Sequence, residues 1–175
     1  PFIYIIVALI IKKKSPGPIY FKQERTGMDG KVFKRIKFRS MKGNNDADTV
    51  QATKDDPRKY PFGDFMRRTN IDELPQFINV WKGEMSLVGP RPHMLKHTEE
   101  YSRIINKFMV RHFAKPGITG LAQVSGFRGE TKHIEQMEGR VKKDIEYIEN
   151  WTFWLDIKIM IKTVTNMIGG EKNAY

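Results

Sequence analysis

The chain has 175 residues, enough for one domain with a hydrophobic core, and its formal net charge is +11 at pH 7. The excess of Lys and Arg favours a polyanionic partner, and a nucleic acid, an anionic bilayer and a phosphorylated substrate all fit. The chain contains no cysteine. This excludes disulfides, thiolate nucleophiles and Cys-ligated zinc, so that any metal must bind oxygen or imidazole.

An apolar run over residues 2–11 opens the chain and is followed by Lys12, Lys13 and Lys14. The run is too short to cross a bilayer as a helix, which needs about 20 residues. It fits half of a membrane span, a re-entrant or interfacial segment, or a buried helix. We expect membrane contact, because the three lysines would meet anionic headgroups on a cytoplasmic face.

Two short strands are predicted after the Pro- and Gly-rich segment 15–18, which ends the apolar run. Residues 19–23 and 32–39 alternate as strands do, and the Gly-containing turn at 27–30 makes them a hairpin with a basic face. The polar stretch 43–57 follows, and we expect it to be a mobile surface loop.

A helix is predicted over residues 62–68, and a second one follows an acidic pair, Asp72 and Glu73. Pro75 is compatible only with the first turn of a helix, so the pair is expected at a helix N-terminus. Helical spacing then continues through four apolar residues, Leu74, Phe77, Ile78 and Trp81.

The second half of the chain is predicted to contain a short strand at 85–88, a helix over 98–112, a loop at 115–120 and a helix over 135–150. Residues 151–168 are apolar but contain Asp and Lys, which suits an interfacial helix better than a membrane crossing. Together these elements predict an α/β (α+β) fold that is mostly helical, with a small sheet or hairpin and with helices lying at the membrane interface.

Asp72 and Glu73 are the first candidates for chemistry. A helix start favours ionised carboxylates, and an ionised Asp is a usable nucleophile toward phosphorus. Neighbouring helical positions point about 100° apart, so the two groups are expected to divide their roles. The alternative is that Asp72 is an N-cap and Glu73 a first-turn acid, because such caps are common.

Arg91 is the second candidate, because Pro90 and Pro92 restrict the backbone on both sides of it. A guanidinium held in one direction suits phosphate binding, although a structural ion pair would use the same geometry. Arg67 and Lys37 are also cationic, but without further context they are surface charges.

Taken together, these residues resemble the monotopic phosphoglycosyl transferases, the bacterial sugar transferases that begin glycan assembly on undecaprenyl phosphate. The resemblance runs over essentially the whole chain and rests on motifs that occur in one order. The motifs are Ser15-Pro16-Gly17-Pro18 with Phe21-Lys22-Gln23-Glu24-Arg25, Lys37-Phe38-Arg39-Ser40-Met41, Asp72-Glu73-Leu74-Pro75-Gln76, Ser86-Leu87-Val88-Gly89-Pro90-Arg91-Pro92, Lys115-Pro116-Gly117-Ile118-Thr119-Gly120 and Trp154-Leu155-Asp156.

The resemblance implies a two-step reaction. Asp72 would attack the β-phosphate of a UDP-sugar, expel UMP and form a phosphosugar-enzyme intermediate that undecaprenyl phosphate then attacks. Glu73 would support proton transfer or bind metal, and a Mg²⁺ held by Asp72 and Glu73 would offset the diphosphate charge. By the same analogy Arg91, with Pro90, would hold phosphate, Arg67 would meet the lipid phosphate, and Lys37 would line the site.

The resemblance also implies a setting. Residues 1–14 would be the remnant of a re-entrant membrane helix and residues 15–175 a cytosolic catalytic domain, at the cytoplasmic face of a bacterial inner membrane. The motifs look most like those of glucose- or galactose-1-phosphate transferases, so a UDP-glucose or UDP-galactose donor, an anionic membrane and no nucleic acid are expected. A homodimer is compatible with the sequence. Two alternatives are a basic nucleic-acid-binding module and a non-enzymatic membrane-surface protein.

Overall fold

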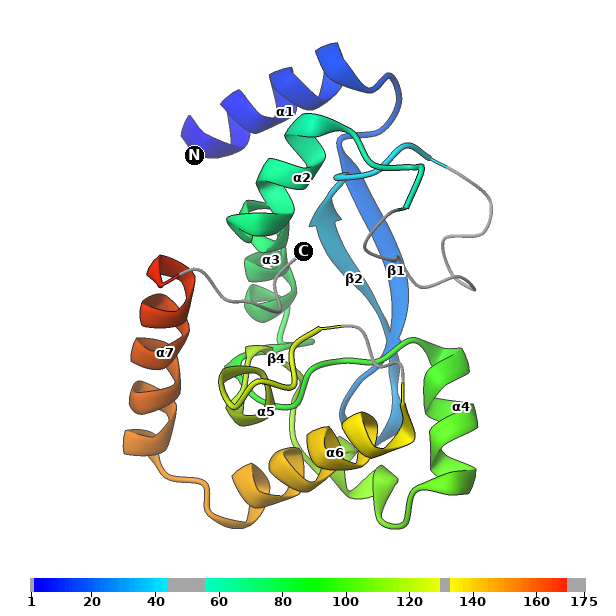
Figure 1. Ribbon diagram of the computed structural model, residues 1–175, viewed down its shortest axis with the longest axis vertical. Coiled ribbons are helices and arrows are strands. Elements are labelled where there is room, and N and C mark those ends of the chain that lie inside the picture. Colours follow the sequence, from blue (N-terminus) through cyan, green and yellow to red (C-terminus); the bar gives the residue numbers. More distant parts are fainter. Residues whose placement is uncertain (1, 44–55, 130–132, 170–175) are drawn as a thin grey trace.

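The computed structural model describes residues 2–43, 56–129 and 133–169 and shows helices arranged around two small two-stranded sheets (Figure 1). In chain order the elements are α1 (Phe2–Lys14), β1 (Tyr20–Thr26), η1 (Met28–Gly30), β2 (Val32–Phe38), α2 (Pro61–Arg68), η2 (Ile71–Glu73), α3 (Gln76–Trp81), β3 (Ser86–Val88), α4 (Leu95–Ile104), η3 (Phe108–Phe113), β4 (Gly117–Thr119), α5 (Leu121–Val124), α6 (Ile134–Glu149) and α7 (Phe153–Ile168), where η marks a 3₁₀ helix. The predicted mixed, largely helical fold is confirmed.

The predicted hairpin is confirmed as β1 and β2, which pair antiparallel from Tyr20 opposite Phe38 to Thr26 opposite Val32. Its turn contains η1, where Asp29 adopts a left-handed conformation with φ 55°. The expected helices over 62–68, 135–150 and 151–168 are confirmed as α2, α6 and α7, with small differences at their ends. The predicted surface loop over 43–57 lies mostly outside the described residues.

The prediction of a loop at 115–120 is wrong, because this segment contains β4, which pairs in parallel with β3. The proline and glycine content of this segment favoured a loop, yet glycine is the residue that allows the two strands to pair. A Cβ on Gly117 would lie 2.2 Å from the backbone nitrogen of Gly89. The two backbones therefore touch directly, which only glycine permits.

The single helix predicted over 98–112 is also wrong. α4 ends at Ile104, Lys107 takes a left-handed conformation with φ 61°, and the 3₁₀ helix η3 follows. The break has a packing reason, because it brings both Ile105 and Phe108 into one buried cluster with Met137 of α6. Burial of these apolar side chains outweighs the local helical preference of the segment.

The acidic pair does not lie at the N-terminus of an α-helix, which corrects the prediction. Asp72 and Glu73 belong to the 3₁₀ turn η2, and α3 begins only at Gln76, after Pro75. The turn starts from Asn70, which has φ 57° and so reverses the chain after α2. Pro75 was correctly expected near a helix start, but the pair precedes that start.

The apolar helix α1 crosses the end of the molecule that contains α2 (Figure 1). It buries Val7 and Ile11 against Phe38 of β2 and Met66 of α2. Its other faces expose large apolar side chains, led by Phe2, which is 79% exposed. Within the described residues, no helix combines the length and the hydrophobicity that a membrane crossing requires.

Polar contacts fix α1 at both of its ends. The Tyr4 hydroxyl donates to the carbonyl of Leu74 at 2.7 Å, directly after the acidic pair. At the other end, Arg39 donates to the carbonyl oxygens of Ser15 and Pro16. The Tyr60 hydroxyl in turn donates to the carbonyl of Arg39 at 2.7 Å, so α1 is tied to β2 and to the segment that leads into α3.

Gly89→Ala should lower the free energy of unfolding by about 1–3 kcal/mol, because its Cβ would lie 2.3 Å from the carbonyl oxygen of Lys115 and push β3 and β4 apart. Urea denaturation would measure the change. Gly43→Ala is the matched control, since its Cβ would meet no atom within 4 Å. Equal stability of the two variants would contradict the close approach of the strands.

Candidate functional site

Asp72 and Glu73 are buried together against strand β2. Asp72 is 5% exposed and Glu73 is 8% exposed, and neither the N-cap residue of η2 nor that of α3 makes a side-chain cap hydrogen bond. Asp72 is therefore not an N-cap, whereas both carboxylates are first-turn acids of η2. Lys37 of β2 meets both carboxylates, with its Nζ 2.7 Å from Glu73 Oε1 and 3.6 Å from Asp72 Oδ2.

Arg91 approaches the same carboxylate from the segment that follows β3. Its Nη2 lies 2.8 Å from Glu73 Oε1, the oxygen that also accepts from Lys37. Pro90, just before it, is buried, and its carbonyl accepts from the backbone N–H of Gly117 at 2.9 Å. The expected ion pair of Arg91 is thus confirmed, and it lies beside the acidic pair, whereas phosphate binding by Arg91 stays a prediction.

Arg35 was missed by the sequence interpretation. It is 6% exposed, its Nε is buried without a hydrogen-bond partner, and burial lowers its pKa to about 10. The nearby Arg91 cation lowers the pKa further, while Glu73 and Asp72 act in the opposite direction. Arg35 stands two positions before Lys37 and so shares its face of β2, a period-two signal that could have identified it.

Arg67 comes from the last turn of α2, and it is one of the cations whose field lowers the pKa of Asp72. Its Nη1 lies 3.1 Å from the sulfur of Met41. The structure therefore brings together all the residues predicted for the site, namely Asp72, Glu73, Lys37, Arg67, Pro90 and Arg91, and it adds Arg35.

The two carboxyl groups differ in protonation behaviour. Burial raises the pKa of Asp72, and Lys37 only partly opposes this. Burial also acts to raise the pKa of Glu73, but Arg91 and Lys37 outweigh it and hold that pKa well below its ordinary value. Glu73 is thus a fixed anion, whereas Asp72 is the more basic carboxylate and the better nucleophile of the two.

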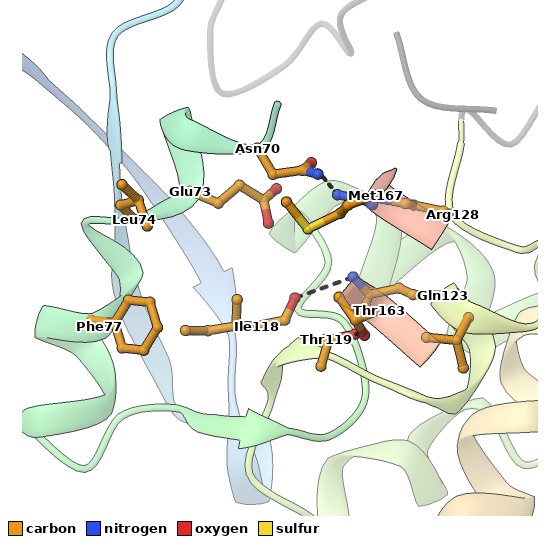
Figure 2. Close-up of a pocket in the computed structure, with 11 residues that line it drawn as sticks. Asn70, Glu73, Leu74, Phe77, Ile118, Thr119, Gln123, Arg128, Thr163 and Met167 are labelled. Carbon is orange, nitrogen blue, oxygen red and sulfur yellow. Dashed lines mark hydrogen bonds between the residues drawn. The ribbon is translucent and has the colours of Figure 1, made fainter. Parts of the chain in front are cut away.

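A cavity of about 150 Å³ adjoins the pair. Glu73 and Asn70 enter it from the η2 side, and Ile118, Thr119 and Gln123 line the opposite side (Figure 2). Its remaining lining residues are Leu74, Phe77, Val124, Arg128, Thr163 and Met167. Arg128 bonds the Asn70 side-chain oxygen, which connects the loop after α5 to the turn that holds the acidic pair.

A buried charge pair supports the backbone of Arg91 from behind. Arg111 Nη2 donates to Asp144 Oδ2 at 2.6 Å and to the carbonyl of Arg91 at 2.7 Å. Arg111 Nη1 also lies 2.5 Å from His93 Nδ1. Burial, with Arg111 and Arg140 nearby, holds the pKa of His93 well below its ordinary value, so that the ring is neutral and its Nδ1 accepts.

A second buried arginine fixes the loop that carries Arg128. Arg140 of α6 donates from Nε to the carbonyl of Phe127 at 3.0 Å and from Nη2 to the carbonyl of Gly129 at 2.9 Å. α6 therefore positions two segments that carry cations. It holds the Arg91 segment through Asp144 and the Arg128 loop through Arg140. The sequence predicted only a helix over 135–150, because only the fold shows which helix face is buried.

The two carboxylates of the acidic pair suit a Mg²⁺ ion that is bound partly by the protein and partly by the phosphates of a substrate. No cluster of three or more His, Asp or Glu side chains able to hold a metal occurs in the ranges that the structure describes. Glu73 receives both of its cations on Oε1, and Mg²⁺ commonly binds one or two carboxylates together with substrate phosphates and water.

Comparisons with known proteins show the family of the chain. Residues 1–170 match the family model described as bacterial sugar transferase. The chain is 57% identical to a UDP-glucose:undecaprenyl-phosphate glucose-1-phosphate transferase of Escherichia coli K12, over 90% of this chain and 34% of that protein. The corresponding Xanthomonas campestris pv. campestris protein of the same description is 49% identical, over 98% of this chain and 36% of its own length.

A more distant relative acts on a different sugar. A UDP-N-acetylgalactosamine-undecaprenyl-phosphate N-acetylgalactosaminephosphotransferase of Aeromonas hydrophila is 40% identical, over 95% of this chain and 39% of that protein. The chain therefore spans about a third of the length of these relatives.

Asp144→Ala should lower the free energy of unfolding by about 3–5 kcal/mol, because it leaves the buried Arg111 guanidinium without its counter-ion. Glu99→Ala is the matched control, since it breaks an exposed ion pair with Arg103 that is worth less than about 1 kcal/mol. Denaturation curves would show both changes. A loss at Asp144 no larger than that at Glu99 would contradict a supporting role for the buried pair.

Proposed function

Because the chain belongs to the bacterial sugar transferase family, we propose that it transfers a sugar-1-phosphate from a UDP-sugar to undecaprenyl phosphate and releases UMP. The names of the Escherichia coli and Xanthomonas relatives favour UDP-glucose as the donor, although UDP-galactose also remains within the proposal. Such a reaction would begin the synthesis of an exopolysaccharide, a capsule or a related glycan.

The buried acidic pair among clustered cations is the observation that carries this proposal. Two carboxylates alone would repel a diphosphate, but Lys37, Arg91 and Arg35 place three positive charges beside them. The Nε of Arg35 has no hydrogen-bond partner although it is buried. A buried unpaired donor is costly, and a phosphate oxygen would supply the missing acceptor.

In the first step, an Asp72 carboxylate oxygen attacks the β-phosphorus of the UDP-sugar. A bond forms between that oxygen and phosphorus, and the bond from phosphorus to the bridging oxygen breaks, so that UMP leaves with the electron pair. The raised pKa of Asp72 supports this role, because a more basic carboxylate is a stronger nucleophile. The product is an aspartyl-phosphosugar intermediate.

In the second step, a phosphate oxygen of undecaprenyl phosphate attacks the same phosphorus. The bond between Asp72 and phosphorus breaks, which regenerates the carboxylate and gives a lipid diphosphate-sugar. Arg67, on the α2 side of Asp72, would receive the lipid phosphate, and Arg91 would hold the transferred one. Because Glu73 stays ionised between Lys37 and Arg91, it keeps both cations directed at the reacting phosphate.

Asp72 and Glu73 would also hold a Mg²⁺ ion. When bound, the ion would offset the negative charge of the diphosphate. The roles of Lys37 and Arg91 do not depend on it, since both cations already contact Glu73.

We further propose a position at the cytoplasmic face of the bacterial inner membrane. Exposed apolar side chains on α1 and α7 support it, including Phe2 at 79% and Trp154 at 77%, together with the lysines that end α1. Insertion of α1 as part of a re-entrant helix and the division at residues 14 and 15 belong to the same proposal. A homodimer stays a prediction. Neither the nucleic-acid-binding module nor the non-enzymatic membrane protein is supported by the relatives.

Asp72→Asn should reduce UMP release by about 10³-fold or more, because the amide cannot attack phosphorus. The assay uses UDP-glucose, undecaprenyl phosphate and Mg²⁺ in detergent, and a labelled phosphosugar adduct should form on the wild-type chain alone. Asp64→Asn, at an exposed carboxylate on α2, is the control. Full activity in the Asp72 variant would exclude this residue as the nucleophile.

The rate should depend on pH in two directions. It should rise as Asp72 loses its proton, above the usual range for Asp because its pKa is raised. It should then fall above about pH 8, because burial lowers the pKa of Lys37 to about 8 and deprotonation removes its charge. Lys37→Arg should move the falling limb to higher pH, since a guanidinium stays protonated there.

Lys34→Arg, at an exposed lysine on the same strand, is the control for this profile. Its pH dependence should match that of the wild-type chain. A falling limb that stays at about pH 8 in the Lys37 variant would assign the limb to another group.

A further inference from the structure

We propose that the cavity beside Glu73 holds the sugar of the UDP-sugar and that Gln123 accepts a hydrogen bond from one of its hydroxyls. This inference rests on the proposed function and adds a specificity-determining residue to it. It starts from an unsatisfied group: Gln123 is 5% exposed and lines the cavity, and its Oε1 is buried without a hydrogen-bond partner.

The orientation of the Gln123 amide is fixed by its other end. Its Nε2 donates to the carbonyl of Ile118 at 3.1 Å, as Figure 2 shows, so a flip would set two oxygens against each other. The oxygen atom of the amide is therefore an acceptor that awaits a donor. Leaving such an acceptor buried is unfavourable, and a bound donor would remove that cost.

The two threonine hydroxyls and the Asn70 side-chain oxygen, which also line the cavity, already have partners. Thr163 donates to the carbonyl of Ile159 at 2.8 Å, so the Thr119 hydroxyl donates to Thr163 at 2.6 Å. The side-chain oxygen of Asn70 accepts from Arg128. The cavity thus offers acceptors, Gln123 Oε1 and the Glu73 carboxylate, to a ligand that brings donors, and a sugar brings several hydroxyl donors.

The position of the cavity selects the sugar half of the donor. Glu73 lines the cavity and is the neighbour of Asp72, which would attack the β-phosphorus. A single oxygen joins the sugar to that phosphorus, whereas the α-phosphate and ribose separate it from the uracil. The group that enters a space adjoining the acidic pair is therefore the sugar.

The size and lining agree with one hexose ring. A volume of about 150 Å³ holds several water molecules, so it has room for a six-membered ring. Apolar side chains, among them Leu74, Ile118 and Val124, provide surfaces for the C–H face of the ring. A mostly apolar wall with a few directed polar groups is the usual composition of a small-molecule site.

The test is a deoxy-sugar scan on two chains. For the wild-type chain and for Gln123→Met, which removes the acceptor at similar volume, kcat/KM for UMP release is measured with UDP-glucose and its 2-, 3-, 4- and 6-deoxy analogues. In the wild type, one analogue should lose about 10-fold against UDP-glucose, the value of one hydrogen bond. In Gln123→Met that penalty should vanish, because UDP-glucose itself loses the same factor.

Three further measurements keep the result interpretable. Gln23→Met, at a glutamine that is 7% exposed in β1, should retain the wild-type deoxy pattern whatever it does to stability. Gln123→Leu also removes the acceptor and should lose the pattern in the same way, which covers a Met variant that fails to fold. Inhibition by UMP should be equal in the wild-type and Gln123→Met chains.

The possible results distinguish a failure of the proposed sugar contact from a failure of the proposed transferase function. An identical deoxy pattern in the wild-type and Gln123→Met chains would overturn the contact with the sugar. Weaker UMP inhibition in Gln123→Met with an unchanged deoxy pattern would also overturn it and would assign the cavity to the base. Absence of UMP release from the wild-type chain with every UDP-sugar would instead refute the proposed function.

Discussion

Two adjacent carboxylates buried in a 3₁₀ turn impose the constraint on which the rest of the structure depends. Burying Asp72 and Glu73 carries a desolvation penalty that is offset only if cations are buried beside them. Lys37 comes from near the end of β2 and Arg91 from the segment after β3, and both bond the same oxygen of Glu73. The hairpin, the η2 turn and the β3 strand are therefore held in register by charge, and apolar packing around them completes the arrangement.

This concentration of charge is supported by a second buried layer. α6 provides Asp144 and Arg140, and η3 provides Arg111, which together hold the backbone of Arg91 and the loop that carries Arg128. These contacts reach the functional cations through carbonyl oxygens, so they set position without competing for substrate. The net charge of +11 is thus partly internal, and composition alone could not show which cations point inward.

Local patterns predicted the hairpin and most of the helices, because period-two and period-3.6 spacing and proline placement are local signals. The residues of the acidic site came from the resemblance to the family, which supplied the context that local patterns lacked. Local patterns failed where distant segments decide the outcome. β4 forms because the backbones of Gly117 and Gly89, distant in sequence, lie in contact. The predicted helix over 98–112 ends early, with α4, because Phe108 packs against α6. Gln123 was missed for the same reason, since its burial depends on the fold, whereas Arg35 could have been found from its period-two relation to Lys37.

The hydrogen bond from Tyr4 to the carbonyl of Leu74 connects the apolar helix α1 to the residue that follows Glu73. Since α1 also packs on Met66 and Phe38, its position and the position of the acidic turn are linked. A change in the tilt of α1 would therefore reach the carboxylates through one hydroxyl. With α1 inserted in a membrane as proposed, the thickness and lateral pressure of the bilayer would act on the same two carboxylates as a substitution in the site.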